Sequence, residues 1–307
     1  MKDPVDEVSD EATEFRMLND TVEGMREILR SQTRLIDACL HRLHLCKLGE
    51  EKIAHADPEV IDVSLTMIHM LGISGHSVIK LTDEISMGVR DAYPIARSIV
   101  EGVINVLFII AKGNDMAKKA KRHAEHKSFR DLQRSFRVGN SVIKTERNVH
   151  LTPEERARLD ALATEFMGRN GREKPWIDEN IQSRIDIIST AFPIASTINL
   201  GAATFNIYRH ASEIVHGTYF AAMHFWGISW SQEKIKNVEQ IRILILNHQF
   251  SILSSVTLAF TALLECTFEY MDETTLKNFA SKEFDRLKHL PLIAKILRST
   301  DQVKSNP

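Results

Sequence analysis

The segment YPIARSIVEGVINVLFIIA, residues 93–111, decides the fold. Apolar side chains occur on every face of a helix drawn through it, so this helix needs neighbours all round and should lie at the centre of a bundle. Arg97, Glu101 and Asn105 interrupt it at one-turn spacing. Charged side chains in a central helix must be paired or solvated, because an isolated buried charge costs several kcal/mol.

Helical patterns continue on both sides of this segment along the 307-residue chain. Glycine and proline are few, 13 and 8, and no run of alternating β-branched residues marks a strand. We therefore predict an all-α protein, a multi-helix bundle with a long N-terminal helix and a basic helical insertion at about residues 113–176. The expected regions are an acidic segment with the long helix, 1–56, a bundle core, 57–272, and a C-terminal helix with a polar tail, 273–307.

The individual helices are expected at these positions: 11–48, 58–84, 93–111, 115–147, 152–169, 178–192, 196–226, 233–270 and 272–287. The length of the first suggests an arm or an element that binds a protein partner. The second carries four small residues that allow another helix to approach closely: Gly72, Ser74, Gly75 and Ser77.

The net charge of -2 hides two opposite local charges. Residues 1–14 hold six acids against one lysine, whereas residues 112–147 hold eleven lysines and arginines against four acids. The apolar runs 103–111 and 251–264 are shorter than the ~20 residues that a membrane-spanning helix needs, so we predict buried helices and no membrane. Three cysteines without metal-site spacing and an N-terminus without an apolar leader favour a reducing cytoplasm.

Several kinds of chemistry lack their motifs in this sequence. Glu213-x-x-His216 occurs once, and a di-iron bundle needs two such pairs. The histidine pairs His41/His44 and His123/His126 are interpreted as solvated helix-face residues, so no metal is expected. Phosphate-binding glycine loops and a nucleophile elbow are missing, which excludes P-loop, dinucleotide-binding and serine-hydrolase chemistry, and no cofactor is expected.

A second polar stripe lies at Tyr-Arg-His-Ala-Ser-Glu-Ile-Val-His-Gly-Thr-Tyr, residues 208–219. Arg209 and His216 are seven residues apart, so on one helix they lie within about 20° of each other, with Ser212 and Glu213 between them. The stripe is either a site for phosphate chemistry or a buried network. In the network, Arg97 would pair with Glu101 or Glu213, and Arg209 with Glu101.

The basic segment is the third candidate. Arg130, Arg134 and Arg137 would share a helix face at steps of four and three, with Phe129 and Phe136 interleaved, and could follow an RNA backbone. The alternative is a solvated helix whose charge is compensated by acids elsewhere, particularly in the acidic N-terminus.

The motif Arg209-x6-His216, with the polar His210 after the arginine, resembles the Arg-x(4–6)-His signature of HEPN domains, the higher eukaryote and prokaryote nucleotide-binding superfamily. Tyr-Arg-x-x-Ser-x-x-Val-His-Gly at 208–217, with Tyr-Pro-x-x-Arg-x-x-x-Glu at 93–101, also resembles a family of uncharacterised bacterial helical domains. The HEPN resemblance covers about residues 58–112 and 180–270.

This resemblance implies a metal-independent endoribonuclease, working as a homodimer and as a bacterial toxin or antiviral effector. His216 would be the general acid or base, Arg209 would hold the phosphate, His210 would follow the arginine, and Glu101 would tune a basic group. The candidate substrate-binding residues are Arg97, Tyr208, Ser212, Glu213 and Tyr219, with Arg130, Arg134 and Arg137 guiding the RNA. The alternatives are a non-catalytic scaffold or sensor that uses the stripes as a structural network, and nucleotide binding without hydrolysis.

Overall fold

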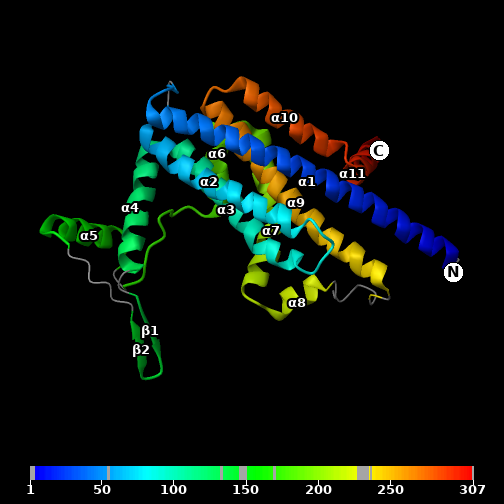
Figure 1. Ribbon diagram of the computed structural model, residues 1–307, viewed down its shortest axis with the longest axis horizontal. Coiled ribbons are helices and arrows are strands. Elements are labelled where there is room, and N and C mark those ends of the chain that lie inside the picture. The colour runs from blue at the N-terminus through cyan, green and yellow to red at the C-terminus, as the bar shows by residue number, and fades with distance from the viewer. Residues whose placement is uncertain are drawn as a thin grey trace.

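The computed structural model describes residues 4–53, 56–131, 134–144, 151–168, 171–226, 235 and 237–305. Within these ranges the chain forms eleven helices and one two-stranded sheet, which confirms the all-α multi-helix bundle (Figure 1). The elements are α1 (Pro4–Leu48), α2 (Pro58–Leu81), α3 (Val89–Lys112), α4 (Asn114–Asp131), β1 (Ser135–Val138), β2 (Ser141–Lys144), α5 (Pro153–Phe166), α6 (Ile181–Ala191), α7 (Ile194–Val215), α8 (Tyr219–Phe225), α9 (Val238–Tyr270), α10 (Thr274–Lys288) and α11 (Pro291–Ser305).

Helices α3 and α9 form the centre of the bundle. α3 contacts α2, α6, α7 and α9, and α9 contacts α1, α7 and α10 in addition. Among the described residues both helices are long and apolar enough to span a membrane, but 56% and 72% of their most apolar windows are buried inside the bundle. The predicted central position of residues 93–111 is therefore confirmed, although the helix begins one turn earlier, at Val89.

Close helix packing explains two of the small residues in α2. A Cβ atom on Gly75 would lie 2.7 Å from the Phe260 ring of α9, and one on Gly72 would lie 3.2 Å from Ile36 of α1. Ser74 and Ser77 instead bond back to carbonyls of their own helix on its exposed side. The two glycines therefore set the distance at which α1, α2 and α9 meet.

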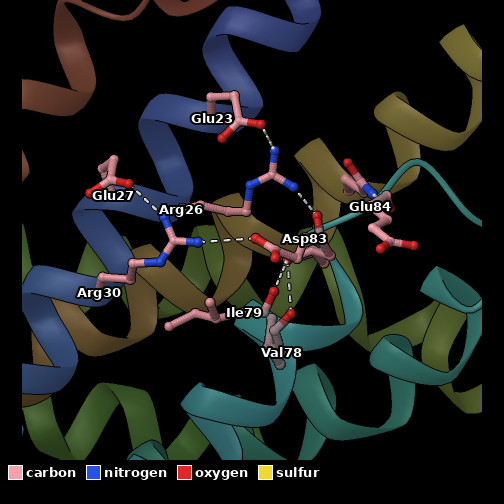
Figure 2. Close-up of polar contacts among 10 residues, drawn as sticks. Glu23, Arg26, Glu27, Arg30, Val78, Ile79, Asp83 and Glu84 are labelled. Carbon is pink, nitrogen blue, oxygen red and sulfur yellow. Dashed lines mark hydrogen bonds and ion pairs between the residues drawn. The ribbon is translucent and has the colours of Figure 1, made fainter.

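The long helix α1 lies along the bundle and is not an arm. Its buried side chains, from Leu18 to Leu43, belong to the same hydrophobic core as α2, α3 and α9. Arg26 is 2% exposed and donates to the carbonyl of Thr82 and to Glu23. Arg30 bonds Asp83 at 3.0 Å, so two arginines fix α1 to the segment that follows α2 (Figure 2).

The basic insertion differs from the prediction. α4 ends at Asp131 instead of near residue 147, and residues 135–144 form an antiparallel hairpin that pairs Phe136 with Ile143 and projects from the bundle (Figure 1). Gly139, with φ at +56°, occupies the two-residue turn Gly139-Asn140, because glycine adopts this left-handed conformation without strain. α5 begins with a capping box formed by Thr152 and Glu155, and it packs a small separate core against Phe129.

The predicted helix over 196–226 is also two helices. α7 ends at Val215, His216 caps it, and Gly217 takes a positive φ of 62° that turns the chain. Thr218 then caps α8, and its hydroxyl accepts from the Ala221 amide. The break places the polar residues of 208–219 around a helix end instead of along one continuous face.

The predicted polar tail is helical over its described part. α11 occupies residues 291–305, and its Leu292 amide donates to the hydroxyl of Thr21 in α1 at 2.9 Å. Leu292 and Ile293 pack against the core. α11 therefore packs against α1.

Candidate active site

In the first polar stripe, Arg97 and Glu101 pair with each other. Arg97 donates from Nε to Glu101 at 3.1 Å and from Nη2 to the Tyr208 hydroxyl at 3.2 Å, and its guanidinium carbon lies 4.4 Å from the centroid of the Tyr208 ring. The network pairing of Arg97 with Glu101 is therefore present. Arg97 also reaches Tyr208, so it joins Glu101 of α3 to Tyr208 of α7 in one contact between the two helices.

Arg184 of α6 extends this network, although no sequence pattern had indicated it. Its guanidinium donates to the Asn105 side chain of α3, and burial lowers its pKa while the charge of Glu101 raises it. Together these contacts satisfy the polar groups that interrupt the central helix.

The second stripe opens toward a pocket. Arg209 is exposed, and its guanidinium carbon lies 5.5 Å from the centroid of the Phe220 ring in α8. In the described part of the chain no carboxylate pairs with it, so the predicted alternative pairing with Glu101 is not formed. Its guanidinium therefore lines the pocket without a carboxylate partner in the described part of the chain.

Three histidines from three helices meet behind Arg209. The rings of His210 (α7) and His224 (α8) stack with centroids 3.9 Å apart and planes 7° apart. His248 (α9) meets the His224 ring edge-on at 5.6 Å. Of these three histidines, only His210 belongs to the motif that resembles the HEPN signature. The signals for His248 were the polar residues Asn247, His248 and Gln249 inside an otherwise apolar helix, whereas His224 carried no signal.

The hydrogen bonds of His248 fix its tautomer. Its Nε2 lies 2.9 Å from the carbonyl oxygen of Phe225, which can only accept, so Nε2 carries the proton. Nδ1 is then the acceptor for the hydroxyl of Tyr93 at 2.7 Å. Burial raises the pKa of Tyr93, which keeps this hydroxyl protonated. His248 thereby ties the end of α8 to α3.

The imidazoles are held neutral by their surroundings. Burial lowers the pKa of His224 to about 4, with smaller effects from His210 and His248. Burial and then the Arg209 charge lower the pKa of His210, and burial lowers that of His248 against the opposing effect of its bond to Phe225. At neutral pH the site therefore presents one full cation, Arg209, beside uncharged rings.

The hollow that these residues line has a volume of about 540 Å³. We call it the α7–α9 pocket; its lining includes Phe205, Asn206, Arg209 and His210 of α7, His224 of α8, and Asn247 of α9. The Nδ1 atom of His210 is buried and has no hydrogen-bond partner among the described residues. In the described part of the chain no group of three or more histidine, cysteine or acidic side chains could hold a metal ion, so the three rings do not converge on one.

The remaining predicted residues of 208–219 lie near the α7–α8 turn. His216 is exposed at the cap of α7, Ser212 is partly buried, and Tyr219 is 81% exposed. Glu213 accepts a hydrogen bond from Thr218 at 2.7 Å, so its carboxylate stabilises the turn. Arg209 and His210 line the pocket. His216 lies at the C-terminal end of α7, outside the pocket lining.

The basic segment is largely neutralised by acids of other elements. Lys121 pairs with Glu59 and Asp62 of α2, Arg122 with Glu165 of α5, and Arg130 with Glu173 at 2.6 Å. This agrees with the predicted alternative of compensated charge, with α2, α5 and the segment around Glu173 as sources.

The three arginines of the basic segment do not share a helix face. Arg134 follows the end of α4 and its side chain is 75% exposed, with Asp131 at 3.9 Å, and Arg137 lies on the exposed strand β1. The interpretation of His123 and His126 as solvated was wrong, because both rings pack on Phe166 of α5. His41 and His44 are exposed, as predicted.

A family model matches the part of the chain that contains most of the site residues. Residues 78–234 match a family of unknown function (DUF5677). The matched range contains Tyr93, Arg97, Arg209 and His224, and it ends before His248. No curated protein and no solved structure matches the chain.

Proposed function

The chain belongs to DUF5677, a family of unknown function, and we propose that the matched region, residues 78–234, forms a metal-independent endoribonuclease site at the α7–α8 turn. The observation that carries the proposal is the Arg209 guanidinium, which pairs with no carboxylate among the described residues and lies beside neutral imidazoles at the mouth of a pocket. An exposed imidazole, His216, stands at the end of the same helix. A cation for a phosphate and imidazoles for proton transfer are the groups that RNA cleavage requires.

The reaction that suits these groups uses the RNA's own 2′-hydroxyl. Its oxygen forms a bond to phosphorus, the bond from phosphorus to the 5′-oxygen breaks, and the products end in a 2′,3′-cyclic phosphate and a 5′-hydroxyl. His216 takes the proton of the 2′-hydroxyl, and the imidazolium so formed returns a proton to the leaving 5′-oxygen. Arg209 donates two hydrogen bonds to the phosphate oxygens, on which negative charge increases in the transition state.

A homodimer is part of the proposal. The outer face of α7 exposes the apolar side chains of Ile194, Ile198 and Val215. A second copy packing on this face would cover the apolar side chains and bring two sets of Arg209 and His216 near one another.

The RNA would extend beyond the pocket toward the hairpin. Arg134 and Arg137 are exposed cations near this hairpin, whereas Arg130 is engaged by Glu173. The proposal includes a role as a toxin or antiviral effector and a protein partner that binds α1.

The test incubates purified protein with total RNA in the presence of EDTA. Wild type should cleave, and Arg209→Ala and His216→Ala should not. His41→Ala, which removes an exposed histidine from α1, is the matched control and should cleave like wild type. Cleavage that survives both site substitutions would remove the proposed site.

A scaffold or sensor is the second candidate, and the closed Arg97–Glu101–Tyr208 network favours it. In that case the polar residues stabilise the bundle and carry no reaction. Stability separates the two, because a structural His216 would cost more than about 1 kcal/mol on truncation. Exposed and at a helix end, His216 should instead be nearly neutral under the ribonuclease proposal.

A further inference from the structure

We infer that the α7–α9 pocket binds one unpaired nucleobase, so that the substrate of the proposed enzyme is single-stranded RNA. The claim that RNA is the substrate rests on the proposed function. Binding of a base in the pocket is tested independently of it. Its volume of about 540 Å³ is in the range of pockets that enclose small ligands.

Flat ring surfaces line the pocket. Phe205, at 86% exposed, lies on the pocket wall four residues before Arg209, one helical turn away. The stacked His210 and His224 rings form a second flat surface within it. Aromatic faces bind nucleobases by stacking, and neutral imidazoles do so without repelling the ring or requiring a counter-ion.

Polar side chains also line the pocket. Asn247 donates from its amide nitrogen to the carbonyl of Ile243 at 3.0 Å, which leaves its amide oxygen as an acceptor. Asn206 adds a second amide. Mixed donors and acceptors of this kind match the edge of a base, which carries both.

The charge distribution separates base from phosphate. Arg209 is the full cation of the lining, and it stands on the exposed surface of α7. The rings behind it are neutral. A nucleotide would therefore place its anionic phosphate on Arg209 and its uncharged base among the imidazoles and amides. A base inside a duplex is stacked and paired, so it cannot enter without being flipped out.

The test uses nucleoside 5′-monophosphates and ribose 5-phosphate as probes. The imidazole NMR signals of His210 and His224 report on the pocket directly. At least one of the four common monophosphates should shift these signals, with a Kd roughly tenfold or more below that of ribose 5-phosphate, which is the scale of base stacking on an aromatic surface. Equal binding of ribose 5-phosphate, or no shift by any monophosphate, would overturn the inference.

Filling the pocket supplies the second arm. Ser251 lines it, and its hydroxyl donates to the carbonyl of Asn247 in the same helix at 3.1 Å. Ser251→Trp should abolish monophosphate binding. Ser128→Trp is the matched control, because Ser128 is an exposed serine with the same bond to the carbonyl four residues earlier on α4. Both variants are first checked for native circular dichroism, and unchanged binding in a folded Ser251→Trp protein would place the base elsewhere.

A binding comparison tests the single-strand preference. The His216→Ala protein should bind a labelled oligoribonucleotide at least tenfold more tightly than the blunt duplex of the same sequence, and equal affinity would contradict the inference. The two proposals fail separately. RNA cleavage without monophosphate binding keeps the enzyme and rejects the base pocket, whereas monophosphate binding without cleavage does the reverse.

Discussion

Replacing Tyr93 by phenylalanine removes one hydroxyl from the interior and leaves the ring that fills the space. Tyr93 is 1% exposed, and its hydroxyl donates to Nδ1 of His248 at 2.7 Å. The other nitrogen of His248 is engaged by the Phe225 carbonyl. In Tyr93→Phe, Nδ1 therefore becomes a buried acceptor without a donor.

The cost of this change follows from burial. A buried polar atom that loses its partner costs about 1–3 kcal/mol, so the free energy of unfolding should fall by that amount. Tyr208→Phe is the matched control. It removes a hydroxyl that accepts from Arg97 in a partly exposed contact, where water replaces the bond and Glu101 still pairs with the arginine. We expect less than about 1 kcal/mol there.

Urea unfolding at neutral pH measures both changes, and a double-mutant cycle isolates the bond. His248→Phe alone should destabilise through the loss of both of its hydrogen bonds. Adding Tyr93→Phe to it should then cost much less than Tyr93→Phe alone, because no unpaired nitrogen remains. Additive effects, or a Tyr93→Phe protein as stable as Tyr208→Phe, would refute the assignment of this buried bond.

Three further predictions concern packing, acid stability and the first polar stripe. Gly75→Ala should destabilise by about 1–3 kcal/mol in urea unfolding, because its Cβ would meet the Phe260 ring at 2.7 Å. Gly201→Ala, whose Cβ meets nothing, should stabilise by about 0.5–1 kcal/mol, and the opposite order would contradict the packing. The pKa of His224 is lowered from 6.5 to about 4, so the unfolded chain takes up the proton first and the unfolding free energy should fall as the pH drops from about 6.5 to about 4. This pH dependence should be weaker in His224→Phe, and an unchanged slope would exclude the assignment. Glu101→Gln should lower thermal stability and leave RNA cleavage within about threefold of wild type, since the carboxylate is engaged by its neighbour on α3; a hundredfold loss of cleavage would return it to the catalytic set.

The bundle was predictable because helix patterns and caps are local. The all-round apolar segment 93–111 identified the central helix, and Thr152 with Glu155 marked the start of α5 through a capping box that the structure contains. The sequence also contained the hairpin signal, since Gly139-Asn140 stands between Phe136-Arg137-Val138 and Val142-Ile143. High charge around this segment concealed it.

The site was less predictable because it depends on contacts between distant segments. Arg209 and His210 were identified from their stripe, but the break at Gly217 was not, although glycine followed by threonine is a helix end followed by a new cap. The partners of His210 come from α8 and α9, and no spacing rule relates them. Likewise, only the three-dimensional contact between α4 and Glu173 shows that Arg130 is neutralised.

The most direct test of the central claim is the chemistry of the cleaved ends. A single-stranded oligoribonucleotide is incubated in EDTA with wild-type, Arg209→Ala, His216→Ala and His41→Ala protein, and the products are identified by mass spectrometry. The account predicts 2′,3′-cyclic phosphate and 5′-hydroxyl ends from wild type and His41→Ala. Both site variants should be slower by on the order of a hundredfold or more, and the all-DNA oligonucleotide should remain intact. Cleavage that requires a divalent metal, or that proceeds at the wild-type rate without Arg209 and His216, would contradict it.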